Sequence, residues 1–434
     1  MTTRRAGGRG FSVSLPDEEL HEELQMSVSL DDIERARLLI QDNIVRTPLI
    51  YAPRLSARFD CRLFLKLETM QATGSFKDRG SLNRLLHLDD EQRRRGVVAM
   101  SAGNHAQGVA YHARRLGVPA KIVMPSFAPF SKVERTRSYG AEVILEGDTL
   151  DASAVRAREI VSEEGRTFIH PYDDDHIIAG QGSIGLEIME DCPDVDAVIV
   201  PIGGGGVISG TAIAAQSLRP SVEVYGVESD RYPSMSRAIA GEAPSFGEAT
   251  IADGIAVKVP GERTRPIVEE RVREIFLCGD DDFERAIFLL LEEQKVVAEG
   301  AGAAGVAALL CNGERFRGRR VVVVVCGGNI DSRMLASVLA RCLMYDSRIL
   351  RLRIRIVDRP GEMSRLSGVI AACGSNILEI HHQRLFADIP AKEADIDAVV
   401  ETSGVEHGEV IRGRLEEAGY RVRILKISTL NHTL

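Results

Sequence analysis

Five consecutive valines, residues 321–325, constrain the fold of this chain more than any other stretch. A strand with one face in solvent alternates apolar and polar residues, so an unbroken apolar run indicates a strand that is buried on both faces. Strands of this kind are typical of parallel sheets that are covered by helices on both sides. We therefore expect further strands and covering helices along the chain.

Strand-like and helix-like stretches alternate over most of the chain, as a helix-covered parallel sheet requires. The expected strands cover residues 63–68, 97–100, 120–124, 142–145, 197–200, 222–227 and 320–325. The expected helices cover residues 81–86, 104–116, 131–138, 150–164, 281–293, 303–310 and 332–344. Another helix is expected to begin at a cap made by Asp31 or Asp32 and to run through Asn43. This order predicts an α/β fold with mostly parallel sheets.

The pattern changes near Arg348. Residues 350–356 alternate leucine or isoleucine with arginine, which indicates a strand with one exposed face. The expected elements that follow are a helix over 363–373, strands over 376–384 and 394–401, a helix over 405–418 and a strand over 421–427. The order β-α-β-β-α-β is that of a ferredoxin-like unit. We expect a second domain over residues 349–430.

Composition excludes several classes of protein. The formal net charge is −9, from 54 basic and 63 acidic residues, so no nucleic-acid partner is expected. Seven cysteines are scattered without a C-x-x-C pair, which argues against a structural zinc site or disulfide scaffold and fits a reducing cytoplasm. No apolar run approaches the roughly 18 residues that cross a bilayer, so no membrane partner is expected. Residues 1–10 lack the apolar part of a secretory signal, and residues 1–28 are expected to form a disordered extension.

Residues 73–80, with the sequence TGSFKDRG, lie between an expected strand and an expected helix. Ligand chemistry is frequent at such positions in α/β proteins. Lys77 in the first turn of the helix would feel the positive end of the helix dipole, which favours its neutral amine. A neutral amine suits a lysine that forms a Schiff base. By itself, the stretch is weak evidence, because a lysine in the first turn of a helix is usually a solvated surface residue.

Four glycines, residues 203–206, follow the expected strand at 197–200 and open a helix. Their backbone N–H groups are suited to wrap an anion at a helix N-terminus, and the alternative is a simple turn. The run matches neither G-x-G-x-x-G nor a Walker motif. A phosphate on a ligand other than a dinucleotide is therefore predicted.

Two more stretches follow strands in the same way. Residues 101–105, Ser-Ala-Gly-Asn-His, offer donors to a carboxylate, or else form only a helix cap. Residues 326–329, Cys-Gly-Gly-Asn, follow the valine strand, and Cys326 is either a ligand contact or a buried structural thiol. A lysine, a phosphate-binding turn, a carboxylate-binding loop and a cysteine at strand ends together indicate pyridoxal phosphate.

These motifs resemble those of the threonine dehydratases (threonine ammonia-lyases), of the tryptophan-synthase-β-like class of pyridoxal-phosphate enzymes, called fold type II. The resemblance spans about residues 31–344 and rests on RTPL at 46–49, KLE at 66–68, GSFK at 74–77, SAGNHAQG at 101–108, the glycine run and CGGN at 326–329. It implies a catalytic domain over 29–345 with two open α/β subdomains, the smaller inserted at about 69–168. Residues 349–430 resemble a regulatory ACT domain, by topology and by DRPG at 358–361.

The resemblance also implies a set of site residues. Lys77 would form the Schiff base and move the α-proton, and Phe76 would lie beside the cofactor ring. Asn104 would hydrogen-bond the 3-oxygen of the ring, and Cys326 would face its pyridine nitrogen. The implied phosphate contacts are Gly203, Gly204, Gly205, Gly206 and Val207, and the implied contacts of the substrate carboxylate are Ser101, Gly103, Asn104 and His105.

The implied activity is dehydration and deamination of L-threonine to 2-oxobutanoate and ammonia, and of L-serine to pyruvate. Related serine racemases carry a serine in place of Ala102, so the alanine favours elimination over racemisation. The divalent-metal site of the racemases would fall on Glu228, Tyr232 and Ser234, and we expect no dedicated divalent metal. The ACT resemblance implies allosteric control by an amino acid and a homodimer or homotetramer.

Two alternatives remain open. One is a racemase, or a dehydratase of another β-hydroxy amino acid. The other is a non-catalytic protein that senses amino acids through its ACT domain, although the presence of Lys77 and the whole phosphate-binding turn argues against it.

Overall fold

The structure is a computed structural model that describes residues 28–383 and 389–425. The expected N-terminal extension lies outside these residues except for Val28, which is buried. The expected strand ends at Arg384 and at Ile427, and the domain end at residue 430, also lie outside them. No helix of the described part is long and apolar enough to cross a membrane.

The valine strand lies inside a six-stranded sheet, as expected. The order of this sheet is β1 (Leu49–Tyr51), β2 (Arg62–Leu67), β10 (Arg320–Val325), β7 (Ala197–Pro201), β8 (Glu223–Ser229) and β9 (Val272–Cys278). Neighbouring strands are parallel except for β1 and β2, which are antiparallel. All five valines of β10 are fully buried, so the prediction of a strand covered on both faces is confirmed.

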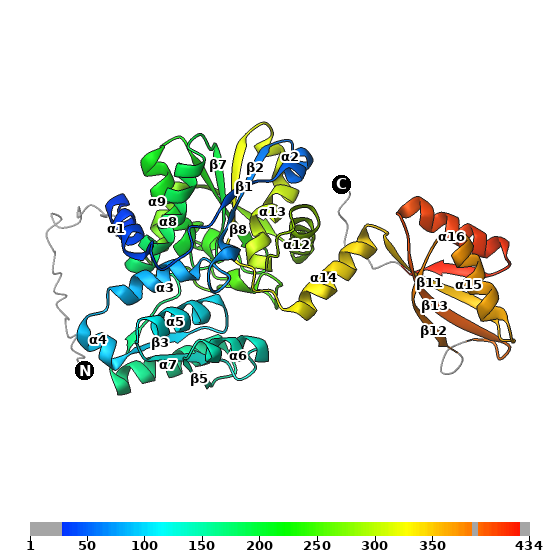
Figure 1. The fold of residues 1–434 in the computed structure, drawn as a ribbon, viewed down its shortest axis with the longest axis horizontal. Helices are drawn as coiled ribbons and strands as arrows, with labels where there is room; N and C mark the ends of the chain where they lie inside the picture. The colour runs from blue at the N-terminus through cyan, green and yellow to red at the C-terminus, as the bar shows by residue number, and fades with distance from the viewer. Residues whose placement is uncertain (1–27, 384–388, 426–434) are drawn as a thin grey trace, which may run out of the picture.

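A second, four-stranded sheet is entirely parallel, with the order β5 (Glu142–Leu145), β4 (Ala120–Met124), β3 (Val97–Met100) and β6 (Thr167–Phe168). Val97 and Ala99 pack into one apolar cluster and Val98 into another, so helices cover both faces of this sheet as well. Figure 1 shows this sheet and its helices as a lobe beside the larger one. The α/β fold with mostly parallel sheets is therefore as predicted.

The helices connect and cover these strands. In chain order they are α1 (Leu30–Ile40), α2 (Pro53–Phe59), η1 (Glu68–Met70), α3 (Lys77–Leu86), α4 (Asp90–Arg95), α5 (Asn104–Arg115), α6 (Phe130–Ser138), α7 (Leu150–Glu164), α8 (Asp175–Asp191), α9 (Gly206–Leu218), α10 (Ser234–Ile239), η2 (Asp253–Ile255), α11 (Thr264–Arg271), α12 (Asp280–Gln294), α13 (Gly300–Asn312), η3 (Gly313–Phe316) and α14 (Ser332–Tyr345).

The cap of α1 differs from the expected one. Ser29, and not Asp31 or Asp32, is the capping residue. Its hydroxyl accepts the N–H of Asp32, while the Asp32 carboxylate accepts the N–H of Ser29 at 2.9 Å. This reciprocal pair is a capping box, in which the acidic residue stands three positions after the cap. The prediction of an aspartate cap is therefore wrong: the serine hydroxyl makes the cap, and Asp32 completes the box from the third position of the helix.

Helix α8 was not among the expected elements, although it packs against α1, α3 and α9. Gly180, Gly182 and Gly185 lower its intrinsic helix propensity, and its buried residues run all around the axis, so no amphipathic pattern marks it. The glycines permit close packing: a Cβ at Gly180 would lie 2.9 Å from the backbone oxygen of Arg79 in α3. Helix α8 therefore fixes the position of the helix that begins with Lys77.

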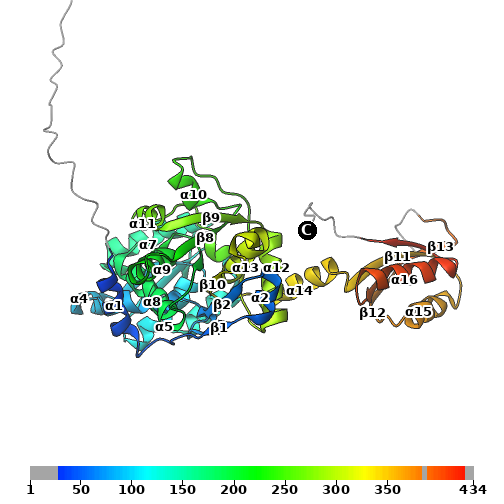
Figure 2. The ribbon, with the colours of Figure 1, turned by 90° about the horizontal axis from the view of Figure 1, so that it is seen from above.

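The C-terminal domain is a four-stranded antiparallel sheet with two helices on one face (Figures 1 and 2). The order of the sheet is β12 (Ile377–Gln383), β13 (Glu393–Glu401), β11 (Ile349–Val357) and β14 (Arg421–Ile424), and the helices are α15 (Glu362–Ala372) and α16 (Val405–Glu417). Leu352, Ile354 and Ile356 of β11 face the helices, while the arginines between them pair with Asp395 and Asp397. This is the predicted ferredoxin-like topology, consistent with an ACT-like domain.

Candidate active site

Lys77 is the first residue of α3, after β2 and η1. Its Nζ donates a hydrogen bond of 2.6 Å to the backbone oxygen of Pro171. Burial lowers the pKa of Lys77 to about 8, although the nearby Cys326 and Glu299 act in the opposite direction. Much of this lysine is therefore a neutral amine near pH 8, which is the form that attacks a carbonyl carbon.

Gly203 to Val207 form the turn between β7 and α9. Helix α9 begins at Gly206, and Gly205 before it has a φ of +96°, which a residue with a Cβ rarely adopts. Within the described residues, no acceptor takes a hydrogen bond from the backbone N–H groups of these five residues. Consecutive free N–H groups at a helix N-terminus bind anions, so this turn fits a phosphate group.

Pro171 and Tyr172 connect the lysine to the glycine turn. The backbone oxygen of Pro171 accepts from Lys77, and the ring of Tyr172 lies so close to Gly204 that a Cβ there would overlap it. Tyr172 Oη donates to the backbone oxygen of Val259 at 2.9 Å, which fixes the ring. The amine and the anion-binding turn are therefore two parts of one site.

Residues 101–103 lie between β3 and α5, and residues 104 and 105 open α5; Ser101 Oγ accepts the N–H of Gly103 at 3.1 Å. The imidazole of His105 is buried, and its Nε2 lies 2.9 Å from the backbone oxygen of Ile169. Burial lowers the pKa of His105 to about 3, so the ring is neutral. The expected role of His105 toward a carboxylate is thus restricted to its backbone N–H.

Asn104, the first residue of α5, has a polar partner on each side of its amide. Its Nδ2 donates to Glu299 Oε1 at 2.5 Å, and its Oδ1 accepts from Asn329 Nδ2 at 2.8 Å. Glu299 directly precedes α13 and is buried. Burial, together with the charge of Asp253, raises the pKa of Glu299 to about 7.

Cys326 follows β10 and is buried, which raises the pKa of its thiol well above the usual value and keeps it neutral. Its backbone oxygen accepts the N–H of Phe76 at 3.0 Å, and Ser75 pairs with Gly327 in an antiparallel bridge. Lys77 Nζ lies 4.9 Å from the centre of the Phe76 ring. The structure thus brings Phe76, Lys77 and Cys326 together.

Behind Lys77, four buried charged side chains hold α3 in place. Arg79 donates to Glu68 at 2.8 Å and to Glu187 at 2.7 Å, and Lys66 also pairs with Glu187. Both carboxylates of this cluster are matched by a cation, so the charges compensate each other in the interior. The cluster ties α3 to β2, to η1 and to α8.

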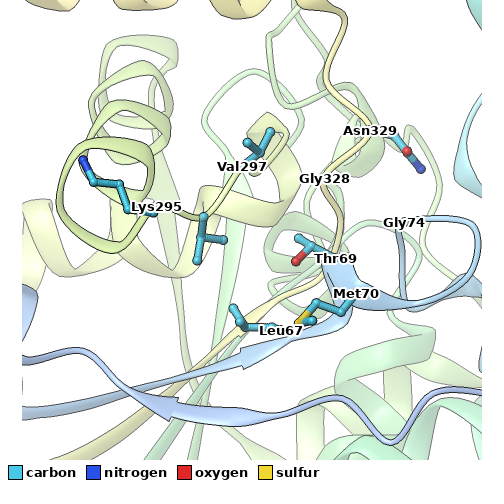
Figure 3. Close-up of a pocket in the computed structure, with 9 residues that line it drawn as sticks. Leu67, Thr69, Met70, Gly74, Lys295, Val297, Gly328 and Asn329 are labelled. Atoms are coloured by element: carbon cyan, nitrogen blue, oxygen red, sulfur yellow. The ribbon is translucent and has the colours of Figure 1, made fainter.

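A cavity of about 360 Å³ adjoins the two segments that carry Phe76 and Cys326 (Figure 3). It is lined by Leu67, Thr69, Met70, Gly74, Lys295, Val296, Val297, Gly328 and Asn329. Figure 3 places Gly74 and Asn329 at one end and Lys295 at the opposite end. The segments 74–77 and 326–329 therefore have open space along one side.

Glu228 caps a helix with both of its carboxylate oxygens. They accept the N–H groups of Met235 at 2.7 Å and Ser236 at 3.0 Å, at the start of α10. The hydroxyl of Ser234 is likewise used, since it donates to the backbone oxygen of Val257. Among the described residues, no three side chains of His, Cys, Asp or Glu gather as a metal site.

A family model described as pyridoxal-phosphate dependent enzyme matches residues 40–327. The chain belongs to this family of pyridoxal-phosphate dependent enzymes. An L-threonine ammonia-lyase of Thermotoga maritima is 45% identical over 400 residues, which are 92% of this chain and 100% of the relative.

Two solved structures of the family extend the comparison. The processed form of threonine deaminase isoform 2 from Solanum lycopersicum is 34% identical with a TM-score of 0.67, over 71% of this chain and 88% of that one. Maize serine racemase is 34% identical with a TM-score of 0.69, over 74% of this chain and 99% of that one. The free N–H groups of residues 203–207 and the neutral amine of Lys77 fit the cofactor of this family.

Sequence reasoning missed Pro171, Tyr172 and Glu299. Pro171 contributes a backbone oxygen, which no sequence pattern reveals. Glu299 precedes a helix of small residues, where an acidic residue is ordinarily a cap. The one available sequence signal was the glycine-rich start of the helix after Glu299: Gly302 allows close approach to Gly327, and Glu299 then lies beside Asn104.

Proposed function

We propose that this protein is a pyridoxal-phosphate dependent threonine ammonia-lyase, which converts L-threonine to 2-oxobutanoate and ammonia and L-serine to pyruvate and ammonia. The observation that carries the proposal is the dipeptide Pro171–Tyr172, in which Pro171 accepts from the amine of Lys77 and the Tyr172 ring packs against Gly204 in the glycine turn. A lysine joined to a phosphate-binding turn is what this cofactor needs. The full-length match to a relative named L-threonine ammonia-lyase supports the substrate.

Each residue of the site has a proposed role. Gly203, Gly204, Gly205, Gly206 and Val207 would hold the phosphate, Phe76 would lie beside the cofactor ring, Asn104 would donate to the ring oxygen and Cys326 would face the ring nitrogen. Ser101, Gly103, Asn104 and the N–H of His105 bind the substrate carboxylate. Lys77 carries the cofactor and moves the α-proton, for which a pKa of about 8 is well matched near neutral pH.

When bound, pyridoxal phosphate supplies an electron sink for the charge that develops at the α-carbon. The residues around it decide the direction of reaction. Cys326 is a neutral thiol, so it does not supply the negative charge that would keep a pyridine nitrogen protonated. The α-carbon then has moderate stabilisation, which favours prompt loss of the β-hydroxyl group. Holding the carboxylate at the start of α5 orients the α-carbon, a positioning effect worth several kcal/mol.

A racemase is the nearest rival, because maize serine racemase is a close structural match. Racemisation needs a second acid on the opposite face of the ring. Ala102 is half-buried among apolar side chains and has no proton to give. Glu228, whose carboxylate caps α10, also supports a site without a dedicated divalent metal.

The proposal is tested by steady-state kinetics with L-threonine and L-serine, together with chiral analysis of the products from L-serine. We expect 2-oxobutanoate and pyruvate as the main products. D-serine formed at a rate that rivals pyruvate would overturn the assignment in favour of a racemase. If the purified protein has no borohydride-reducible absorption band, the non-catalytic amino-acid sensor is the hypothesis that remains.

We further propose that residues 29–345 form the catalytic domain, with the smaller subdomain at about 69–168, and that residues 349–430 regulate it. Strand β12 is at the edge of the C-terminal sheet and exposes Leu378 and Ile380, which supports side-by-side pairing of two copies in a homodimer or homotetramer. Seven free cysteines support a cytoplasmic location.

The regulatory part of the proposal is that an amino acid binds the C-terminal domains and changes the activity. Helix α14 runs from the loop that contains Cys326 and Asn329 to β11 of that domain, which supports a direct mechanical link (Figure 1). Threonine saturation curves measured with added isoleucine, valine and other amino acids test it. Curves that stay unchanged would exclude those ligands as effectors.

A further inference from the structure

We propose that Asn329 is a positioning residue, which fixes the amide of Asn104 so that both of its N–H groups point away from Asn329. This inference rests on the proposed function, in which Asn104 donates to the ring oxygen of the cofactor. Asn329 itself lies in the loop between β10 and α14 and is half-buried. Its side chain hydrogen-bonds three groups that come from three different segments of the chain, namely Thr73, Asn104 and Arg135.

The orientation of the Asn329 amide follows from its partners. Its Nδ2 lies 2.7 Å from the backbone oxygen of Thr73, which can only accept a hydrogen bond. Its Oδ1 lies 2.9 Å from Arg135 Nη1, which can only donate. Both contacts require the same assignment of nitrogen and oxygen, so a flipped amide would face a donor with a donor and an acceptor with an acceptor.

The orientation of Asn104 then follows from that of Asn329. The second hydrogen of Asn329 Nδ2 points to the Asn104 side chain at 2.8 Å, so the atom that receives it must be the Asn104 oxygen. The Asn104 nitrogen therefore lies on the other side, where it donates one hydrogen to Glu299 Oε1 at 2.5 Å. Its second hydrogen remains for the ring oxygen of the cofactor.

Glu299 is part of the same arrangement. It accepts from the Asn104 amide through Oε1, and it also accepts the backbone N–H of Asn329. Even when Glu299 holds a proton, Oε1 must stay an acceptor, because the Asn104 nitrogen faces it. The contacts of Glu299 with Asn104, of Glu299 with Asn329 and of Asn104 with Asn329 thus form a closed set of donors and acceptors in which only one arrangement satisfies every group.

The glycine at position 74 leaves the space that this arrangement needs. Gly74 has a φ of +77°, and a Cβ at this position would lie 2.7 Å from Asn329 Oδ1. Figure 3 shows Asn329 next to Gly74, at the end of the cavity that is remote from Lys295. A glycine at position 74 is therefore required for the Asn329 amide to reach Thr73 and Asn104 together.

Asn329→Asp tests the inference with a change of one atom. The aspartate keeps an acceptor for Arg135 but has no hydrogen for Thr73 or Asn104, so the Asn104 amide is expected to turn and present its oxygen to the cofactor. We expect the absorption band of the bound cofactor to shift and pyridoxal phosphate to bind at least about tenfold more weakly, as expected when a hydrogen bond to a charged group is lost. Asn43→Asp, at an exposed amide that pairs with Arg115, is the matched control for the charge change.

A double-mutant cycle separates positioning from a general structural role. Asn329→Ala alone should shift the absorption band and lower kcat more than it changes KM. In an Asn104→Ala background, the same substitution should add less than a twofold change in cofactor affinity and no further spectral shift. Equal effects of Asn329→Ala in both backgrounds would overturn the inference, as would an Asn329→Asp variant with wild-type spectrum and affinity. Failure of the wild type to bind pyridoxal phosphate would refute the proposed function itself. That outcome differs from those that overturn the role of Asn329, which all require a wild type that binds the cofactor.

Discussion

At the scale of single residues, Lys77 is a buried amine whose pKa is shifted toward neutrality. Burial lowers this pKa from 10.5 to about 8, and only the neutral amine reacts with an aldehyde. The rate at which the apoprotein combines with pyridoxal phosphate should therefore rise with pH and level off above a midpoint near pH 8. Stopped-flow absorbance over a range of pH measures this midpoint. A midpoint above about 10, as for an exposed lysine, would contradict the account.

Glu299 shows the opposite shift, because burial raises its pKa from 4.5 to about 7. Between these values the unfolded chain has released the proton and the folded protein still holds it, so the wild type loses stability as pH rises from about 4.5 to 7. Glu299→Gln removes this loss. On going from pH 5 to pH 8, the unfolding free energy of this variant should therefore rise relative to that of the wild type by on the order of 3 kcal/mol. Urea titrations at both values measure the gain, and a difference independent of pH would refute it.

At the scale of elements, the start of α3 is held by the buried cluster of Arg79, Glu68, Glu187 and Lys66. Arg79→Met leaves two buried carboxylates with one cation, so we expect a loss of about 3–5 kcal/mol of unfolding free energy. Arg58→Met is the matched control, because Arg58 pairs with Glu293 at the surface and should cost no more than about 1 kcal/mol. Similar urea midpoints for both variants would contradict a role of the cluster in holding α3.

Sequence patterns predicted those elements in which the residue types themselves indicate which positions are buried. The valines of β10 and the alternating β11 indicate burial directly, and both strands lie where expected. Helix α8 escaped because glycines and apolar residues on every side carry no periodic signal, and its helical state depends on packing against α3 and α9. The glycine turn could be proposed as an anion site from the sequence because backbone N–H groups alone would bind the anion. Pro171 and Glu299 entered the site only through tertiary contacts.

At the scale of the whole molecule, the C-terminal domain exposes Leu378 and Ile380 on its edge strand. If two copies pair along β12, Ile380→Glu places a charge in that contact, where it is desolvated. We expect this variant to dissociate into smaller species at concentrations at which the wild type remains associated, as measured by light scattering. Val405→Glu, at an exposed position at the start of α16, should leave the mass unchanged. An unaltered mass for Ile380→Glu would exclude pairing through this edge.

The central claim is that Lys77 carries the cofactor. Borohydride reduction of the protein in the presence of pyridoxal phosphate, followed by digestion and peptide mass spectrometry, tests it most directly. The account predicts that a single peptide gains the mass of the reduced cofactor, that fragmentation places it on Lys77, and that Lys77→Ala takes up no label. Labelling of another lysine in the wild type, or of Lys77→Ala to the same extent, would contradict the account.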